Sequence, residues 1–148
     1  MSIDPENHPI EEKIVALVFE LNCFRVYSPY WSCEGHTFPN GDLFRIPQVW
    51  FYSRSLVYPQ LLNDYLHELY CSKKIKYMWQ VRFNWTDDSE NLEAGFTLEP
   101  NLSDVKNPQL MFMQNDAKTI SQNLQSGLRN MAIKYIGMLK GYGAAANA

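Results

Sequence analysis

Residues 76–85 read KYMWQVRFNW, and this stretch decides the fold. Apolar and polar side chains alternate along it, which is the period of a β-strand with one buried face. The large side chains on one face are Tyr77, Trp79, Val81, Phe83 and Trp85. We therefore predict a sheet with one packed face and one face that meets solvent or a partner. Core packing is the favoured role of these aromatic rings, and stacking on nucleic-acid bases is the alternative.

An acidic segment at residues 86–93 and a strand-like run at residues 94–98 follow. We predict that the two strands pair antiparallel through this loop. Its carboxylates are Asp87, Asp88, Glu90 and Glu93. Their spacing does not match a calcium-binding EF-hand loop, so we expect a solvated hairpin tip. Residues 110–113 predict a short edge strand.

Three segments have apolar residues at helical spacing, and we predict helices at residues 9–21, 56–72 and 116–140. Asp116 has the side chain of a good N-cap for the last helix. Gly141 is well placed to end that helix, and we expect residues 142–148 to form a loosely ordered tail.

Two further strands are predicted at residues 24–32 and 48–52. The second is nearly continuous in apolar residues, which is typical of a central strand buried on both faces. Between them, residues 33–46 form a loop or short hairpin, in which Asn40-Gly41 favours a tight turn. The order is α-β-β-α-β-β-α. It predicts one α+β domain over residues 1–148, a two-layer sandwich with about three helices and a mostly antiparallel sheet of four to five strands.

The composition limits the classes of function. The chain has thirteen Lys and Arg and sixteen Asp and Glu, which gives a formal charge of −3. This negative charge disfavours dedicated nucleic-acid binding, because such proteins contact phosphates with an excess of basic residues. The three cysteines are Cys23, Cys33 and Cys71; their odd number favours reduced thiols and a cytoplasmic location. The sequence has no signal-peptide pattern at its start and no apolar run of about 18 residues, so we expect a soluble protein and no membrane partner.

The strongest candidate site is the run Ser32-Cys33-Glu34-Gly35-His36 at a strand end. It places a thiol, a carboxylate and an imidazole beside a glycine that permits a sharp turn. We predict a ligand-binding loop here; a purely structural turn and covalent catalysis by the Cys33 thiol are the alternatives. The candidate ligand-binding residues are Ser32, Cys33, Glu34, Gly35, His36, Tyr30, Trp31, Asn40 and Arg45.

Two pairs of residues, one of them in this run, have the spacing of zinc ligands. Cys33 and His36 have a C-x-x-H spacing, and His67 and Cys71 lie four apart on the second predicted helix, so the four residues make up a Cys₂His₂ set. At 100° per residue, however, His67 and Cys71 lie opposite the apolar stripe of their helix. We therefore predict no metal ligands.

The same stretch resembles a known family. An asparagine at a helix end, a strand and a Ser-Ser-Cys-Ser-Gly-Arg run are similar to a signature of the wybutosine-synthesis methyltransferases, which modify transfer RNA. The segments that carry the resemblance are Leu21-Asn22, Tyr27-Ser28 and Ser32-Cys33-Glu34-Gly35-His36. Ser32, Cys33 and Gly35 match the motif, whereas Trp31, Glu34 and His36 replace a serine, a serine and the arginine. The resemblance covers about 16 of 148 residues and implies a shared architecture rather than an inherited activity.

Taken together, these features predict a small domain that binds a small molecule or nucleotide at the Cys33–His36 loop. The cofactor and any catalysis are left open. The alternative is a non-catalytic protein-interaction or regulatory module, because 14% of the residues are aromatic and such residues anchor interfaces. A homo-oligomer is compatible with either function.

Overall fold

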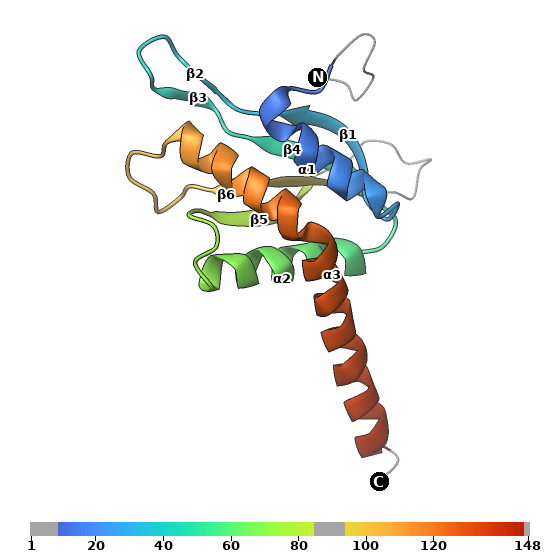
Figure 1. The fold of residues 1–148 in the computed structure, drawn as a ribbon. Helices are drawn as coiled ribbons and strands as arrows, with labels where there is room; N and C mark the ends of the chain where they lie inside the picture. Colours follow the sequence, from blue (N-terminus) through green and yellow to red (C-terminus); the bar gives the residue numbers. More distant parts are fainter. Residues whose placement is uncertain (1–8, 85–93, 147–148) are drawn as a thin grey trace.

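The structure, a computed structural model, describes residues 9–84 and 94–146, with side chains up to residue 141 (Figure 1). The acidic loop and Trp85 lie outside these residues. The elements are α1 (Glu12–Cys23), β1 (Ser28–Cys33), β2 (His36–Thr37), β3 (Leu43–Arg45), β4 (Gln48–Ser53), α2 (Val57–Cys71), β5 (Met78–Asn84), β6 (Ala94–Asn101) and α3 (Leu110–Ala146).

The main sheet has four strands in the order β1-β4-β6-β5, and all neighbours are antiparallel. Strands β2 and β3 form a separate two-stranded hairpin. Its turn uses Asn40-Gly41 as predicted: Gly41 has φ +90°, and the Asp42 N–H donates to Asn40 Oδ1 at 3.0 Å. The predicted α+β class, element order and mostly antiparallel sheet are therefore confirmed.

Alternate residues of the sheet point to the helices and build the core. In β4, Val49 and Phe51 are fully buried, and they pair with Leu98 and Phe96 of β6 on the same face. On the neighbouring strand Trp79 is also buried, which places this ring in the core. Strand β4 is central, as predicted. Its outward residues are only half-buried, so it is covered fully on one face and not on both.

Strand β1 is shorter than predicted, because the chain first has to leave α1. The Phe24 and Arg25 N–H groups donate back to the carbonyls of Leu21 and Asn22, and Arg25 has φ +58°. These bonds close the helix end and delay the strand to Ser28.

The last helix is longer than predicted at both ends. Residues 110–113, the predicted edge strand, are its first turn, and the predicted start at Asp116 is wrong. The Asp116 carboxylate does not cap its own helix: Oδ1 accepts the Lys76 N–H and Oδ2 the Tyr77 N–H, each at 2.8 Å. The helix also continues past Gly141, because that residue keeps a helical φ instead of a positive one.

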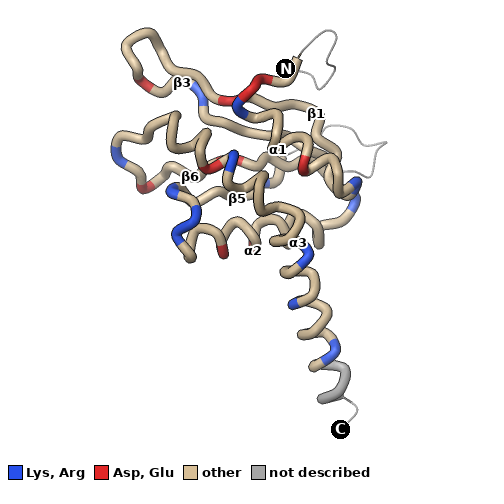
Figure 2. Tube along the Cα trace, in the orientation of Figure 1, with Lys and Arg blue, Asp and Glu red and all other residues tan. Residues whose placement is uncertain are grey.

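Charge is distributed unevenly along the chain (Figure 2). Residues 1–116 hold nine Lys and Arg against sixteen Asp and Glu, a formal charge of −7. Residues 117–148 hold four Lys and Arg and no acidic residue, a formal charge of +4. Among the described residues, no helix combines the length and the apolar character needed to cross a membrane.

Candidate metal centre

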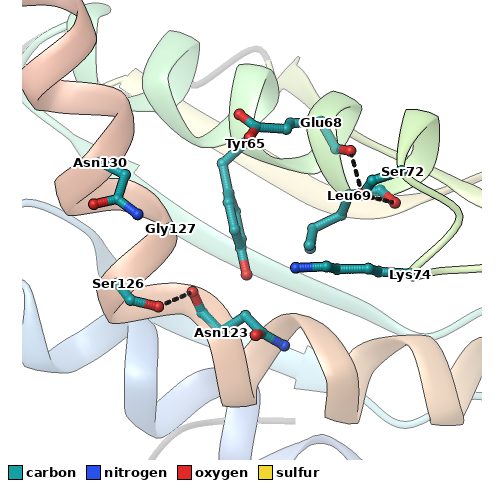
Figure 3. Close-up of a pocket in the computed structure, with 9 residues that line it drawn as sticks. All are labelled: Tyr65, Glu68, Leu69, Ser72, Lys74, Asn123, Ser126, Gly127 and Asn130. Carbon is teal, nitrogen blue, oxygen red and sulfur yellow. Dashed lines mark hydrogen bonds between the residues drawn. The ribbon is translucent and has the colours of Figure 1, made fainter.

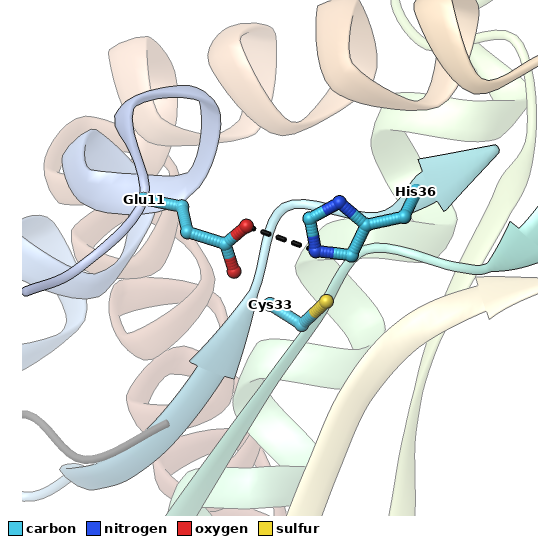
Figure 4. A group of neighbouring side chains, drawn as sticks. All are labelled: Glu11, Cys33 and His36. Atoms are coloured by element: carbon cyan, nitrogen blue, oxygen red, sulfur yellow. Dashed lines mark ion pairs between the residues drawn. The ribbon is translucent and has the colours of Figure 1, made fainter. Parts of the chain in front are cut away.

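A glycine turn between β1 and β2 joins Cys33 to His36 (Figure 4). Gly35 has φ +87°, a conformation that side chains rarely adopt, and a Cβ there would lie 3.0 Å from the Arg45 carbonyl oxygen and would collide with Leu110. The Gly35 N–H donates to Cys33 Sγ at 3.4 Å. The turn therefore needs glycine, and it holds the thiol and the imidazole on one side of the loop.

The third member of the cluster is Glu11, which directly precedes α1. His36 Nε2 lies 2.9 Å from Glu11 Oε2. One ligating atom each from Glu11, Cys33 and His36 lies within 4.8 Å of the others. Sequence reasoning missed Glu11, because its only local signal was an acidic residue at the start of a helix, where the helix dipole favours it.

Glu34 holds the cluster together from outside. Its Oε2 accepts the Lys13 N–H at 2.8 Å, so it caps the first turn of α1 from across the loop. Its carbonyl oxygen accepts a hydrogen bond from Gln114 Nε2 of α3 at 3.0 Å. Glu34 therefore links the turn between β1 and β2 to the start of α1 and to α3.

The environment of the cluster is polar but largely closed. Cys33 is fully buried, and burial raises the pKa of its thiol. The Gly35 N–H and the Arg45 side chain act in the opposite direction, and Glu11 adds to the increase in pKa. The Glu11 side chain is 15% exposed, and its buried Oε1 has no hydrogen-bond partner. His36 is 39% exposed, which leaves a path from solvent.

The nine predicted ligand-binding residues do not form one site. Cys33, Gly35 and His36 are at the cluster, with Arg45 paired to His36 across the hairpin. Ser32 is buried in β1, and Asn40 sits at the hairpin tip. Tyr30 and Trp31 point away from the cluster, on the outer face of the sheet. The Tyr30 and Tyr52 rings are stacked with their centroids 4.2 Å apart, and the Trp31 and Trp50 ring centroids are 4.6 Å apart.

His67 and Cys71, the other members of the Cys₂His₂ spacing, do not join Cys33 and His36. His67 Nε2 and Cys71 Sγ are 3.4 Å apart on the exposed face of α2. They do not belong to the group formed by Cys33, His36 and Glu11.

A cavity of about 130 Å³ between α2 and α3 is a separate feature (Figure 3). Its wall includes the Tyr65 ring, whose hydroxyl donates to the Ile120 carbonyl at 3.1 Å, and Lys74. None of the predicted ligand-binding residues lines this cavity. The Glu11, Cys33 and His36 side chains converge instead at the glycine turn, with ligating atoms within 4.8 Å of one another.

Comparisons with protein-family models, with curated proteins and with solved structures each found no match. The resemblance to the wybutosine-synthesis methyltransferases is not tested by these comparisons and stays a prediction.

Proposed function

We propose that this domain binds a divalent transition-metal ion, with zinc as the reference ion, through Glu11, Cys33 and His36. The small ligand expected at the Cys33–His36 loop is then a metal ion. The observation that carries the proposal is the convergence of a thiol, an imidazole and a carboxylate within 4.8 Å, drawn from two segments of the chain. The sequence predicted no metal ligands because His67 and Cys71 lie on the far side of their helix, whereas Glu11 lies beside His36 at 2.9 Å.

The chemistry of the three side chains favours zinc over magnesium or calcium. Thiolate and imidazole are the ligands that zinc prefers, whereas magnesium and calcium take oxygen ligands. Three protein ligands leave a fourth tetrahedral position for water. A thiolate and a carboxylate together also supply the two negative charges that balance a dication.

The distance between His36 and Glu11 requires only a small adjustment. His36 Nε2 and Glu11 Oε2 are separated by 2.9 Å, the length of a hydrogen bond. Two atoms bound to one zinc ion at about 2.0–2.2 Å in tetrahedral geometry lie about 3.3 Å apart. The buried Glu11 Oε1, which lacks a hydrogen-bond partner, supports the same reading, because a buried acceptor without a donor is rare.

The test is metal titration of chelator-treated protein with Zn²⁺ and with Co²⁺, whose visible absorption reports a thiolate ligand. We expect one ion per chain, and loss of binding in Cys33→Ser, His36→Gln and Glu11→Gln. The matched controls are Cys71→Ser and His67→Gln, which remove the same chemical groups from the exposed pair on α2 and are expected to bind normally. Normal binding by Cys33→Ser, or loss of binding in Cys71→Ser, would reject this site.

A non-catalytic interaction module is the second candidate, and one observation favours it. Four aromatic rings lie together, only half-buried, on the sheet face opposite the core: Tyr30, Trp31, Trp50 and Tyr52. Aromatic side chains are enriched where proteins bind one another. A stoichiometric partner that co-purifies with the native protein, is lost in a Trp31→Ala/Trp50→Ala variant and is kept in Phe44→Ala, an exposed aromatic on the hairpin, would support this function.

A further inference from the structure

A polar pocket lies where the end of α1, the start of β1 and the connection from β4 to α2 meet. Its volume is about 550 Å³, within the range of roughly 300–1,000 Å³ that is typical of small-molecule sites. The pocket shares no residue with the Glu11 cluster, so it is separate from the proposed metal site. The lining residues are Arg25, Val26, Ser28, Tyr52, Ser53, Arg54, Ser55 and Tyr58.

The charged residues of the pocket are two arginines, Arg25 and Arg54. None of the described residues that line it is acidic, although residues 1–116 as a whole carry a formal charge of −7. Two guanidinium groups balance the charge of about −1.5 to −2 that a phosphate monoester carries at pH 7. Arginine also matches the oxygens of phosphate with paired N–H donors. A carboxylate ligand, with one negative charge, would balance only one of the two arginines.

A serine hydroxyl adds a neutral donor beside Arg54. Ser55 Oγ accepts the Val57 N–H at 3.3 Å, and a hydroxyl that accepts one hydrogen bond can still donate its own proton. Ser53 is already engaged, because its Oγ donates to the Ser55 carbonyl oxygen at 3.1 Å. Ser55 and Arg54 are therefore adjacent donors for one anionic group.

Two tyrosines extend the wall beyond what a phosphate group alone needs. The Tyr52 ring is stacked on the Tyr30 ring, and the Tyr58 ring meets the buried Tyr27 ring edge-on with the centroids 6.4 Å apart. Tyr52 is only half-buried and Tyr58 is exposed, so both remain accessible to a ligand. Aromatic rings held in this way offer a surface against which a planar ring packs.

We propose that this pocket binds a small molecule that carries a phosphate group and a planar ring, the chemistry of a nucleotide. Arg25 and Arg54 bind the phosphate, and Tyr52 and Tyr58 contact the planar ring. The site does not depend on metal binding, because the Glu11 cluster involves different residues.

The test is isothermal titration of the full chain with three probes: adenosine monophosphate (AMP), adenosine and inorganic phosphate. EDTA in the buffer prevents a metal ion at the Glu11 cluster from binding the phosphate instead. We expect one AMP per chain, and binding of adenosine and of inorganic phosphate that is weaker by about tenfold or more, because each lacks one half of the contacts.

Two variants of the pocket are compared with one matched control. Arg25→Gln and Arg54→Gln are each expected to weaken AMP binding by about tenfold or more, because each removes hydrogen bonds to a charged group. Arg129→Gln makes the same change at an exposed arginine of α3 that does not line the pocket, and it is expected to bind AMP as wild type does. Circular dichroism checks that each variant is folded, and if Arg25→Gln fails to fold, Arg54→Gln decides the question.

Four results would overturn the assignment: no saturable AMP binding at millimolar concentration, equal affinity for AMP and adenosine, wild-type affinity in a folded pocket variant, or an equal loss in Arg129→Gln. Inorganic phosphate bound as tightly as AMP would contradict the contact with a planar ring. A phosphoserine peptide is the last probe, and a peptide that binds more tightly than AMP would assign the pocket to a phosphorylated protein instead.

Discussion

Cys33 combines two properties that govern how a metal ion binds. Burial raises the pKa of its thiol, so the free protein holds a proton on sulfur at neutral pH. The same residue lies beside an imidazole and a carboxylate that are ready to share an ion. Binding must therefore displace the thiol proton, and the cost of doing so depends on pH.

At the residue scale we predict that zinc affinity rises by about tenfold per pH unit between pH 7 and 8, because one thiol proton is released on binding. Isothermal titration in two buffers of different ionisation enthalpy measures both the affinity and the proton count. An affinity that does not change across this range would mean that the Cys33 sulfur is not a ligand.

Only part of the candidate site was predictable at this scale. Cys33, Gly35 and His36 could be recognised because they are close in sequence and because glycine permits the turn. Glu11 could not, because its contact with His36 spans 25 positions and exists only after α1 docks on the hairpin. Glu34 lies in the predicted loop, and its side chain accepts the Lys13 N–H at the start of α1, a contact that no local pattern indicated.

At the scale of the elements, the contact between α2 and α3 depends on a glycine. The Tyr65 ring packs so closely on Gly127 that a Cβ at that position would collide with it (Figure 3). Gly137, on the same helix, has open space where a Cβ would be added. Close packing against Tyr65 therefore favours glycine at position 127, whereas no packing contact requires glycine at position 137.

We predict that Gly127→Ala lowers the free energy of unfolding by up to about 2 kcal/mol, because an overpacking cost of roughly 1–3 kcal/mol is only partly offset by a gain of about 1 kcal/mol in helix propensity. Gly137→Ala is the control, and it gains propensity without a clash, so its free energy of unfolding is expected to stay equal or rise by up to about 1 kcal/mol. Urea unfolding measures both. A Gly127→Ala variant more stable than wild type by about 1 kcal/mol, the full gain in helix propensity, would show that Tyr65 moves aside without cost.

The helices and strands were largely predictable, because their apolar periods of 3.6 and 2 are properties of neighbouring residues. The start of α3 was not. Asp116 has the residue type of a helix cap, but its carboxylate accepts the N–H groups of Lys76 and Tyr77, the two residues just before β5. A residue type alone does not tell which backbone N–H groups a side chain will meet.

For the molecule as a whole, Asp116 is a single buried point where the last helix is joined to the sheet. It accepts the N–H groups of Lys76 and Tyr77, and its Oδ2 also lies 3.3 Å from Trp79 Nε1. Burial raises the pKa of this carboxyl, and the three donors act in the opposite direction.

We predict that Asp116→Ala lowers the free energy of unfolding by about 2–4 kcal/mol, because it leaves buried N–H groups without an acceptor. Asp104→Ala removes an exposed carboxylate and is expected to change stability by less than about 0.5 kcal/mol. Chemical denaturation followed by tryptophan fluorescence compares the two. Equal stability of both variants would mean that the cavity at Asp116→Ala admits water to those groups.

For the whole molecule, the sequence was sufficient to predict the α+β class with a mostly antiparallel sheet. Alternation in residues 76–84 indicated a sheet packed on one face, and Tyr77 and Trp79 are buried as expected. The core position predicted for Phe83 is wrong, because this residue near the end of β5 is 56% exposed. The strand order β1-β4-β6-β5 was not predictable, because it depends on pairings between distant segments that no local pattern encodes.

Glu34 accepts two hydrogen bonds that connect three parts of the domain. The Glu34 carboxylate accepts the Lys13 N–H at the start of α1, and the Glu34 carbonyl oxygen accepts a hydrogen bond from Gln114 of α3. The residues on either side of Glu34 form the turn to β2. Three segments that are far apart in sequence therefore share one anchor. We therefore expect opening of the 33–36 turn to free the Lys13 N–H, so that this amide exchanges its hydrogen together with the turn.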